Sequence, residues 1–145
     1  MMLRTQFVSS PEQPHPKFFL DRSLGRKAVP EALRADDWEI ITLAEHYGVP
    51  ADEQVADVEW IREAAEQGWP ILMKDKRIRY RQAERQAVIE HGARCFVITR
   101  GDLSSAEMVR RFVANKATIL AWVAEPGPYI YTVQLDRLTR LYPPS

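Results

Sequence analysis

The sequence predicts an α/β domain with a mostly parallel central sheet that helices cover on both faces. Short apolar runs typical of buried strands alternate along the chain with segments whose apolar residues recur at helical spacing. Two of these runs, residues 18–20 and 70–74, are each followed at once by an aspartate. A chain of 145 residues with 46% apolar residues is sufficient for one ordinary core, so we expect a single folded domain.

The first 15 residues are polar and rich in proline, and we expect them to form a flexible arm. The domain then extends over residues 16–142, beginning with the strand that precedes Asp21. Residues 23–35 have helical spacing, but Pro30 within them predicts a kink or two short helices. A second strand is expected over residues 38–43, and a loop follows residues 44–48.

The second half of the chain repeats the alternation of helix and strand. We expect helices over residues 57–67, 77–90 and 104–125, and strands over residues 71–74, 94–99 and 129–135. Ser104 and Glu107 have the spacing of a capping box, which predicts where the last helix begins. The final residues, 142–145, are expected to be a frayed tail.

Composition narrows the cellular setting without identifying a partner. The chain has 20 basic and 20 acidic residues, so only the local distribution of charge can indicate a polyanionic ligand. Cys95 is the only cysteine, which excludes a disulfide within one chain and suits a cytoplasmic protein. No stretch resembles a signal peptide or approaches the roughly 20 apolar residues of a membrane span, so we expect no membrane contact.

Four carboxylates fall where a parallel sheet would gather them. Asp21 and Asp75 follow strands, Glu45 lies just beyond a strand, and Asp57 begins a helix. The carboxyl ends of parallel strands meet at one edge of the sheet, where such folds bind ligands. Carboxylates suit Mg²⁺ or Mn²⁺, and such a cation can lower the pKa of a bound water for attack on phosphorus.

Other kinds of catalytic site are missing from the sequence. The chain has no glycine-rich phosphate loop and no Gly-x-Ser-x-Gly elbow, and its three histidines lack metal-ligand spacing. A basic run begins at the second aspartate and comprises Lys74, Lys76, Arg77, Arg79, Arg81 and Arg85. On a helix over residues 77–90, Arg77, Arg81 and Arg85 would share one face, where they could follow an RNA backbone.

Each candidate also has a purely structural interpretation. Asp57 could serve only to cap its helix, an interpretation that stays open beside a metal role, and Glu45 could be an ordinary surface acid. A basic run is usually a solvated helix face. Asp21 and Asp75 favour function more strongly, because an aspartate that ends so apolar a strand is less often merely structural.

At these residues the sequence resembles the PIN and PIN-like nucleases, the domain of VapC-type toxins. Residues 19–21 match the first strand and first acidic position of that family, and the resemblance extends over about residues 17–100. Residues 57–61 match the third acidic position, and residues 71–76 match the fourth. The second acidic position departs from the pattern: Glu45 is the candidate, and its rivals are Glu31, Asp37 and Glu59.

The resemblance implies a three-layer α/β/α domain and an endoribonuclease that depends on Mg²⁺ or Mn²⁺. Asp21, Asp57 and Asp75 would hold the cation and Glu45 would complete the site, while RNA would contact Lys74, Lys76, Arg77, Arg81 and Arg85. A cognate antitoxin protein would cover the site, and a homodimer is left open. The alternative is a catalytically silent PIN-like scaffold that binds a protein or RNA. A phosphatase is disfavoured, because its Asp-x-Asp motif is replaced here by Asp21-Arg22-Ser23.

Overall fold

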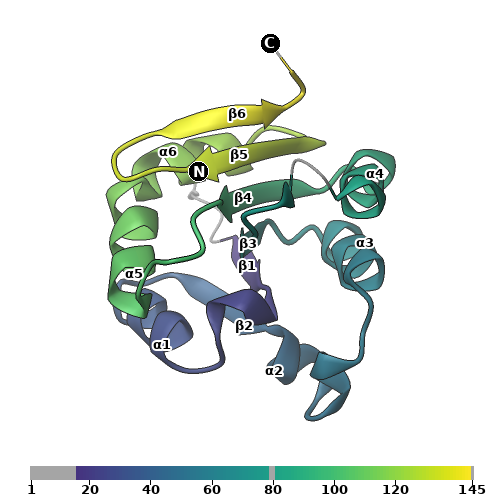
Figure 1. The fold of residues 1–145 in the computed structure, drawn as a ribbon, viewed down its shortest axis with the longest axis horizontal. Coiled ribbons are helices and arrows are strands. Elements are labelled where there is room, and N and C mark those ends of the chain that lie inside the picture. Colours follow the sequence, from purple (N-terminus) through teal and green to yellow (C-terminus); the bar gives the residue numbers. More distant parts are fainter. Residues whose placement is uncertain (1–15, 79–80, 145) are drawn as a thin grey trace, which may run out of the picture.

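The central element of the fold is a six-stranded sheet in the order β2-β1-β3-β4-β5-β6 (Figure 1). The computed structural model describes residues 16–78 and 81–144. Strands β1 to β5 are all parallel to one another, and β6 is antiparallel to β5. Their bounds are β1 Lys17–Leu20, β2 Glu39–Thr42, β3 Ile71–Lys74, β4 Arg94–Ile98, β5 Tyr129–Val133 and β6 Leu138–Tyr142.

Helices cover both faces of this sheet, which confirms the predicted α/β class. Figure 1 shows α1, α5 and α6 on one side of the sheet and α2, α3 and α4 on the other. The bounds are α1 Ala28–Ala35, α2 Leu43–Tyr47, α3 Asp57–Gln67, α4 Gln82–His91, α5 Ser105–Ala114 and α6 Lys116–Val123. The short 3₁₀ helices η2 Arg22–Leu24 and η3 Ala51–Glu53 lie in the connections. No helix within the described ranges is long and apolar enough to cross a membrane.

Strand β1 illustrates why these apolar runs form buried strands. Phe18 and Leu20 belong to the apolar cluster on the α1 and α5 side, whereas Phe19 belongs to the opposite cluster with Trp60 of α3. The side chains of these three residues are at most 1% exposed. A strand buried on both faces must be apolar at successive positions, and this explains the continuous run before Asp21.

Several elements lie where the sequence predicts them. The segment after β1 divides into η2 and α1, as Pro30 suggests, and α3 has the predicted bounds. Gly68 ends α3 in the left-handed conformation that glycine adopts most easily. The capping box of Ser104 and Glu107 is present at the start of α5.

The helix expected over residues 77–90 begins later, at Gln82, so this prediction is wrong at its amino end. Asp75 accepts a hydrogen bond from the amide of Arg77, and Ile78 is only 2% exposed. These contacts fix residues 75–78 as a turn packed against the core. Arg81 is the residue before α4, and its backbone is not helical. The expected shared helical face of Arg77, Arg81 and Arg85 is therefore absent. Arg79 lies outside the described residues.

Three other expectations need correction. The long helix over residues 104–125 is two helices, because the buried Asn115 between them donates to the carbonyls of Arg111 and Gln134. The segment 44–47, expected to lead into a loop, lies in α2, which Thr42 caps. Residues 138–142 form β6, so the expected last strand is the fifth of six. The predicted arm, residues 1–15, lies outside the described residues.

Candidate active site

The candidate site lies where β1 and β3 end side by side at the carboxyl edge of the sheet. The chain leaves β1 toward α1 on one face and leaves β3 toward α4 on the other face. Such a divergence opens the crevice in which α/β sheets bind ligands. The amide of Asp21 donates to the carbonyl of Leu72 at 3.1 Å, so the first carboxylate is still fixed to the neighbouring strand.

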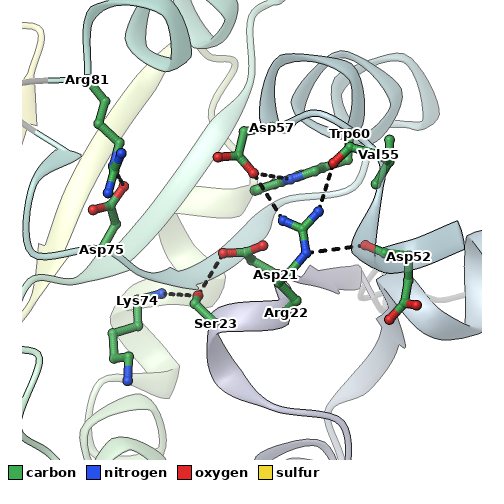
Figure 2. Close-up of polar contacts among 10 residues, drawn as sticks. All are labelled: Asp21, Arg22, Ser23, Asp52, Val55, Asp57, Trp60, Lys74, Asp75 and Arg81. Carbon is green, nitrogen blue, oxygen red and sulfur yellow. Dashed lines mark hydrogen bonds and ion pairs between the residues drawn. The ribbon is translucent and has the colours of Figure 1, made fainter. Parts of the chain in front are cut away.

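Asp21 has an unusual environment for a carboxylate. The residue is 7% exposed, and its Oδ2 accepts a hydrogen bond from the Ser23 hydroxyl at 2.7 Å (Figure 2). Its Oδ1 is buried and has no hydrogen-bond partner among the described residues. Burial raises the pKa of Asp21 above its ordinary value, although the Ser23 hydrogen bond opposes it; the nearby charge of Asp57 adds to the rise.

Asp57 stands at the start of α3, and its side chain does not cap that helix. Its Oδ1 accepts hydrogen bonds from the Trp60 indole at 2.9 Å and from the Arg22 guanidinium at 3.3 Å (Figure 2). The same guanidinium donates to the carbonyls of Val55 at 2.7 Å and Asp52 at 3.2 Å. Arg22 therefore fixes both Asp57 and the loop that leads into its helix.

Asp75 is held by the basic segment that follows it. Its Oδ1 accepts from the Arg77 amide at 2.9 Å, and its Oδ2 accepts from the Arg81 guanidinium at 2.6 Å. The side chain is only 11% exposed. Both oxygens of this carboxylate thus accept hydrogen bonds from donors in its own segment, and Figure 2 shows the contact with Arg81.

Glu45 lies on α2, beyond the edge strand β2, and has a structural role there. Its carboxylate accepts from the Thr42 amide at 3.0 Å and from the Arg34 guanidinium at 2.7 Å. Partial burial favours the neutral form of Glu45, but hydrogen bonds from Arg34 and Thr42 outweigh that effect and lower its pKa.

The three rivals for this acidic position are also accounted for. Glu31 is exposed in the first turn of α1, and Glu59 pairs with Arg62 on α3. Asp37 lies in a left-handed turn before β2, at the amino edge of the sheet. In the part of the chain that the structure describes, no hydrogen bond or ion pair joins these three carboxylates to Asp21 or Asp57, and the acidic charge that acts on Asp21 is that of Asp57.

The structure therefore brings together two of the four predicted carboxylates. The charges of Asp21 and Asp57 interact. Asp75 instead forms an ion pair with Arg81, and Glu45 forms one with Arg34. In the part of the chain that the structure describes, no three acidic, histidine or cysteine side chains are grouped closely enough to hold a metal ion. The unpartnered Oδ1 of Asp21 and the second oxygen of Asp57 still fit a hard cation that keeps most of its waters.

The basic residues at this edge divide into exposed and engaged groups. Lys76 and Arg77 are exposed in the turn after β3, and the side chain of Lys74 extends away from Asp21 in Figure 2. Arg81 is paired with Asp75, and Arg85 is half-buried on α4. Lys76 and Arg77 are therefore predicted RNA contacts that are exposed and lie outside the ion pair of Asp75 with Arg81.

Sequence reasoning missed the two residues that hold the carboxylates. Ser23 donates to Asp21 and accepts the amide of Lys74 at 3.0 Å, while Arg22 donates to Asp57. Their position directly after Asp21 was the available signal. Asp52 was also missed; it is 1% exposed, and both of its carboxylate oxygens accept hydrogen bonds from Arg26.

Comparison with known proteins identifies the family. Residues 16–100 match the family model described as a PIN like domain, and the chain belongs to this family. The chain is also 39% identical over 123 residues to a Mycobacterium tuberculosis (strain ATCC 25618 / H37Rv) protein named as a candidate ribonuclease, VapC45. This alignment covers 85% of the chain and 89% of the relative. No solved structure matches the chain significantly. The predicted resemblance is therefore confirmed.

The raised pKa of Asp21 predicts an unusual pH dependence of stability. A carboxyl whose pKa is higher in the folded state destabilises that state when it is ionised. In EDTA, Asp21→Asn should therefore raise the melting temperature at pH 7. The gain should shrink as the pH falls toward the ordinary value of 3.8, where the wild-type carboxyl becomes neutral in both states.

The control variant is Asp102→Asn. Arg100 lowers the pKa of Asp102, so ionisation of this carboxyl stabilises the folded state. Removal of the carboxyl should therefore destabilise the protein, which is the opposite of the effect expected at Asp21. Asp102→Asn should slightly lower the melting temperature at pH 7, and the difference should vanish in acid. Thermal unfolding followed by circular dichroism at several pH values measures both. A melting temperature for Asp21→Asn below that of wild type throughout would contradict the burial argument.

Proposed function

We propose that this protein is a metal-dependent endoribonuclease. The observation that carries the proposal is the buried Oδ1 of Asp21, which has no hydrogen-bond partner among the described residues and lies near the carboxylate of Asp57, at the crevice of a PIN-like sheet. An unpaired buried carboxylate oxygen is costly, and a divalent cation would offset that cost. The 39% identity to a relative named as a candidate ribonuclease supports the same conclusion.

Asp21 and Asp57 would hold Mg²⁺ or Mn²⁺ through the oxygens that face away from Ser23 and Arg22. Asp75 would join them once its carboxylate exchanged Arg81 for the cation, and Glu45 would contribute only after release from Arg34. When bound, the cation lowers the pKa of a water molecule, so that hydroxide is available for attack on phosphorus.

The exposed basic residues would bind the RNA backbone beside this cluster. Lys76 and Arg77 directly follow Asp75, so a phosphate that they hold would lie next to the carboxylates. Their positive charge would also stabilise the extra negative charge on phosphorus in the transition state. Lys74, Arg81 and Arg85 would contribute to the same basic surface, with Arg81 available once it leaves Asp75.

A catalytically silent scaffold is the second candidate function. The observation that favours it is that Asp75 and Glu45 each pair with an arginine, which leaves two carboxylates for a cation. A protein of this kind would bind RNA or a protein partner through the same edge without cutting it. Cleavage assays separate the two functions directly.

The first test is cleavage of a structured RNA by the purified protein. With Mg²⁺ or Mn²⁺ the RNA should be cut, and EDTA should abolish cutting because the carboxylates need the cation. Asp21→Asn should lower the rate by roughly a hundredfold or more, since it removes the central negative ligand. Asp102→Asn is the matched control and should cut like wild type. Cutting that persists in EDTA would exclude the proposed chemistry.

The contribution of Lys76 and Arg77 to RNA binding can be measured from the salt dependence of RNA affinity. Each phosphate contact on a single strand makes the slope of log affinity against log salt more negative by about 0.7. Replacing Lys76 and Arg77 together by glutamine should therefore flatten the slope by about 1.4 in a fluorescence anisotropy titration. The control pair Arg110→Gln and Arg140→Gln, on α5 and β6, should leave the slope unchanged. Equal slopes for all proteins would mean that the RNA path lies elsewhere.

We further propose that the protein is the toxin of a toxin-antitoxin pair, because it resembles VapC-type toxins and its relative carries the VapC name. An unrestrained ribonuclease would harm the cell that makes it. Expression in a bacterium should therefore stop growth, whereas expression of Asp21→Asn should not. Co-expression of the neighbouring open reading frame should restore growth. Unimpaired growth with a soluble, active wild-type enzyme would exclude the toxin role.

A further inference from the structure

Two consecutive residues after Asp21 each bind one oxygen of one site carboxylate. We propose that Arg22 and Ser23 are positioning residues that fix Asp57 and Asp21, so that the second oxygen of each carboxylate faces the cation. This inference rests on the proposed function, because it assigns the support of the same metal site. Its basis is the hydrogen-bond geometry of the tripeptide Asp21-Arg22-Ser23 (Figure 2).

The hydrogen bonds of Ser23 have a defined direction. A hydroxyl has one proton, and the backbone amide of Lys74 can only donate. The Lys74 amide donates to Ser23 Oγ at 3.0 Å, so the hydroxyl proton is directed to Asp21 Oδ2 at 2.7 Å. Lys74 ends β3 beyond the last residue that pairs with β1, so Ser23 supplies the partner that the strand no longer provides.

This arrangement fixes the orientation of the Asp21 carboxylate from two strands. Asp21 follows β1, while the amide that orients Ser23 belongs to β3. With Oδ2 held by the hydroxyl, Oδ1 is the oxygen left without a partner in the described part of the chain. A ligand oxygen fixed in this way binds a cation without first losing rotational freedom.

Arg22 orients Asp57 in a similar way. Its guanidinium donates to the carbonyls of Val55 and Asp52 from two nitrogens, and its third nitrogen donates to Asp57 Oδ1 at 3.3 Å. Trp60 donates to the same oxygen, so both protein donors hold one side of the carboxylate. The planar, five-donor geometry of arginine allows these three contacts at once, which a lysine ammonium cannot reproduce.

The test for Ser23 is Mn²⁺ affinity, measured by electron paramagnetic resonance of the free ion. Ser23→Ala should weaken Mn²⁺ binding by about tenfold, the usual effect of losing a partner of a metal ligand. Ser23→Thr keeps the hydroxyl and should restore affinity to near wild type. Ser23→Cys, which keeps the size and weakens the donor, serves if Ser23→Ala does not fold.

The matched control for Ser23 is Ser104→Ala. Ser104 also accepts a backbone amide, that of Glu107, but it contacts no site carboxylate. Both alanine variants should lower the melting temperature in EDTA, whereas only Ser23→Ala should lower Mn²⁺ affinity. Wild-type affinity in Ser23→Ala or Ser23→Cys would overturn the role of Ser23.

The test for Arg22 is Arg22→Lys, which keeps the charge and removes the three-contact geometry. Mn²⁺ affinity should fall by about tenfold, although the electrostatic field at the site is nearly preserved. Arg62→Lys is the control, because Arg62 pairs with Glu59 and Glu66 on the same helix as Asp57 but not with Asp57. Equal affinity in Arg22→Lys and wild type would overturn the role of Arg22.

The outcomes distinguish this inference from the proposed function. Wild-type protein that binds Mn²⁺ without cutting RNA, with affinity that depends on Ser23 and Arg22, would support positioning and exclude the nuclease. Wild-type protein that binds no Mn²⁺ would overturn both. If RNA is cut, the variants should lower kcat at limiting Mn²⁺ with little change in KM for RNA, and saturating Mn²⁺ should restore the rate.

Discussion

The candidate site depends on a carboxylate that the fold buries at the end of its first strand. Asp21 continues a strand whose side chains are covered on both faces, so its carboxylate has little access to water. Among the described residues, only one of its oxygens has a hydrogen-bond partner. A buried charge in this state is unfavourable unless something compensates it, and no described side chain fully does so. The hydrogen bond from Ser23 partly stabilises this charge.

The contacts that hold Asp21 and Asp57 come from elements that are distant in sequence and adjacent in space. Ser23 connects Asp21 to β3, and Arg22 connects the same segment to η3 and α3. A single short 3₁₀ helix thereby fixes both acidic residues that interact in the structure. Protein donors therefore hold one side of each carboxylate. Such positioning by neighbouring side chains is what the proposed cation site would require.

Much of this fold follows from patterns that act locally. Continuous apolar runs predicted the buried strands, and Gly68 and the Ser104 capping box predicted helix ends, because each signal arises within a few residues. The errors occurred where contacts between residues far apart in the sequence determine the local structure. Ile78 is buried in the core, and α4 begins only after it. Asn115 separates α5 from α6 and donates a hydrogen bond to the carbonyl of Gln134. Position along the chain led us to expect all four carboxylates at one edge of the sheet, but could not reveal that Arg81 pairs with Asp75 and Arg34 with Glu45.

The pairing of Glu45 with Arg34 has a consequence for association between molecules. Within the described residues, strand β2 is at the edge of the sheet and pairs with β1 alone, so part of its backbone could pair with a strand from another chain. Arg34 donates to the carbonyl of Ile40, and Glu45 accepts the amide of Thr42. These side chains occupy backbone groups that a foreign strand would need. Glu45 thus helps to keep the sheet from extending by edge-to-edge aggregation.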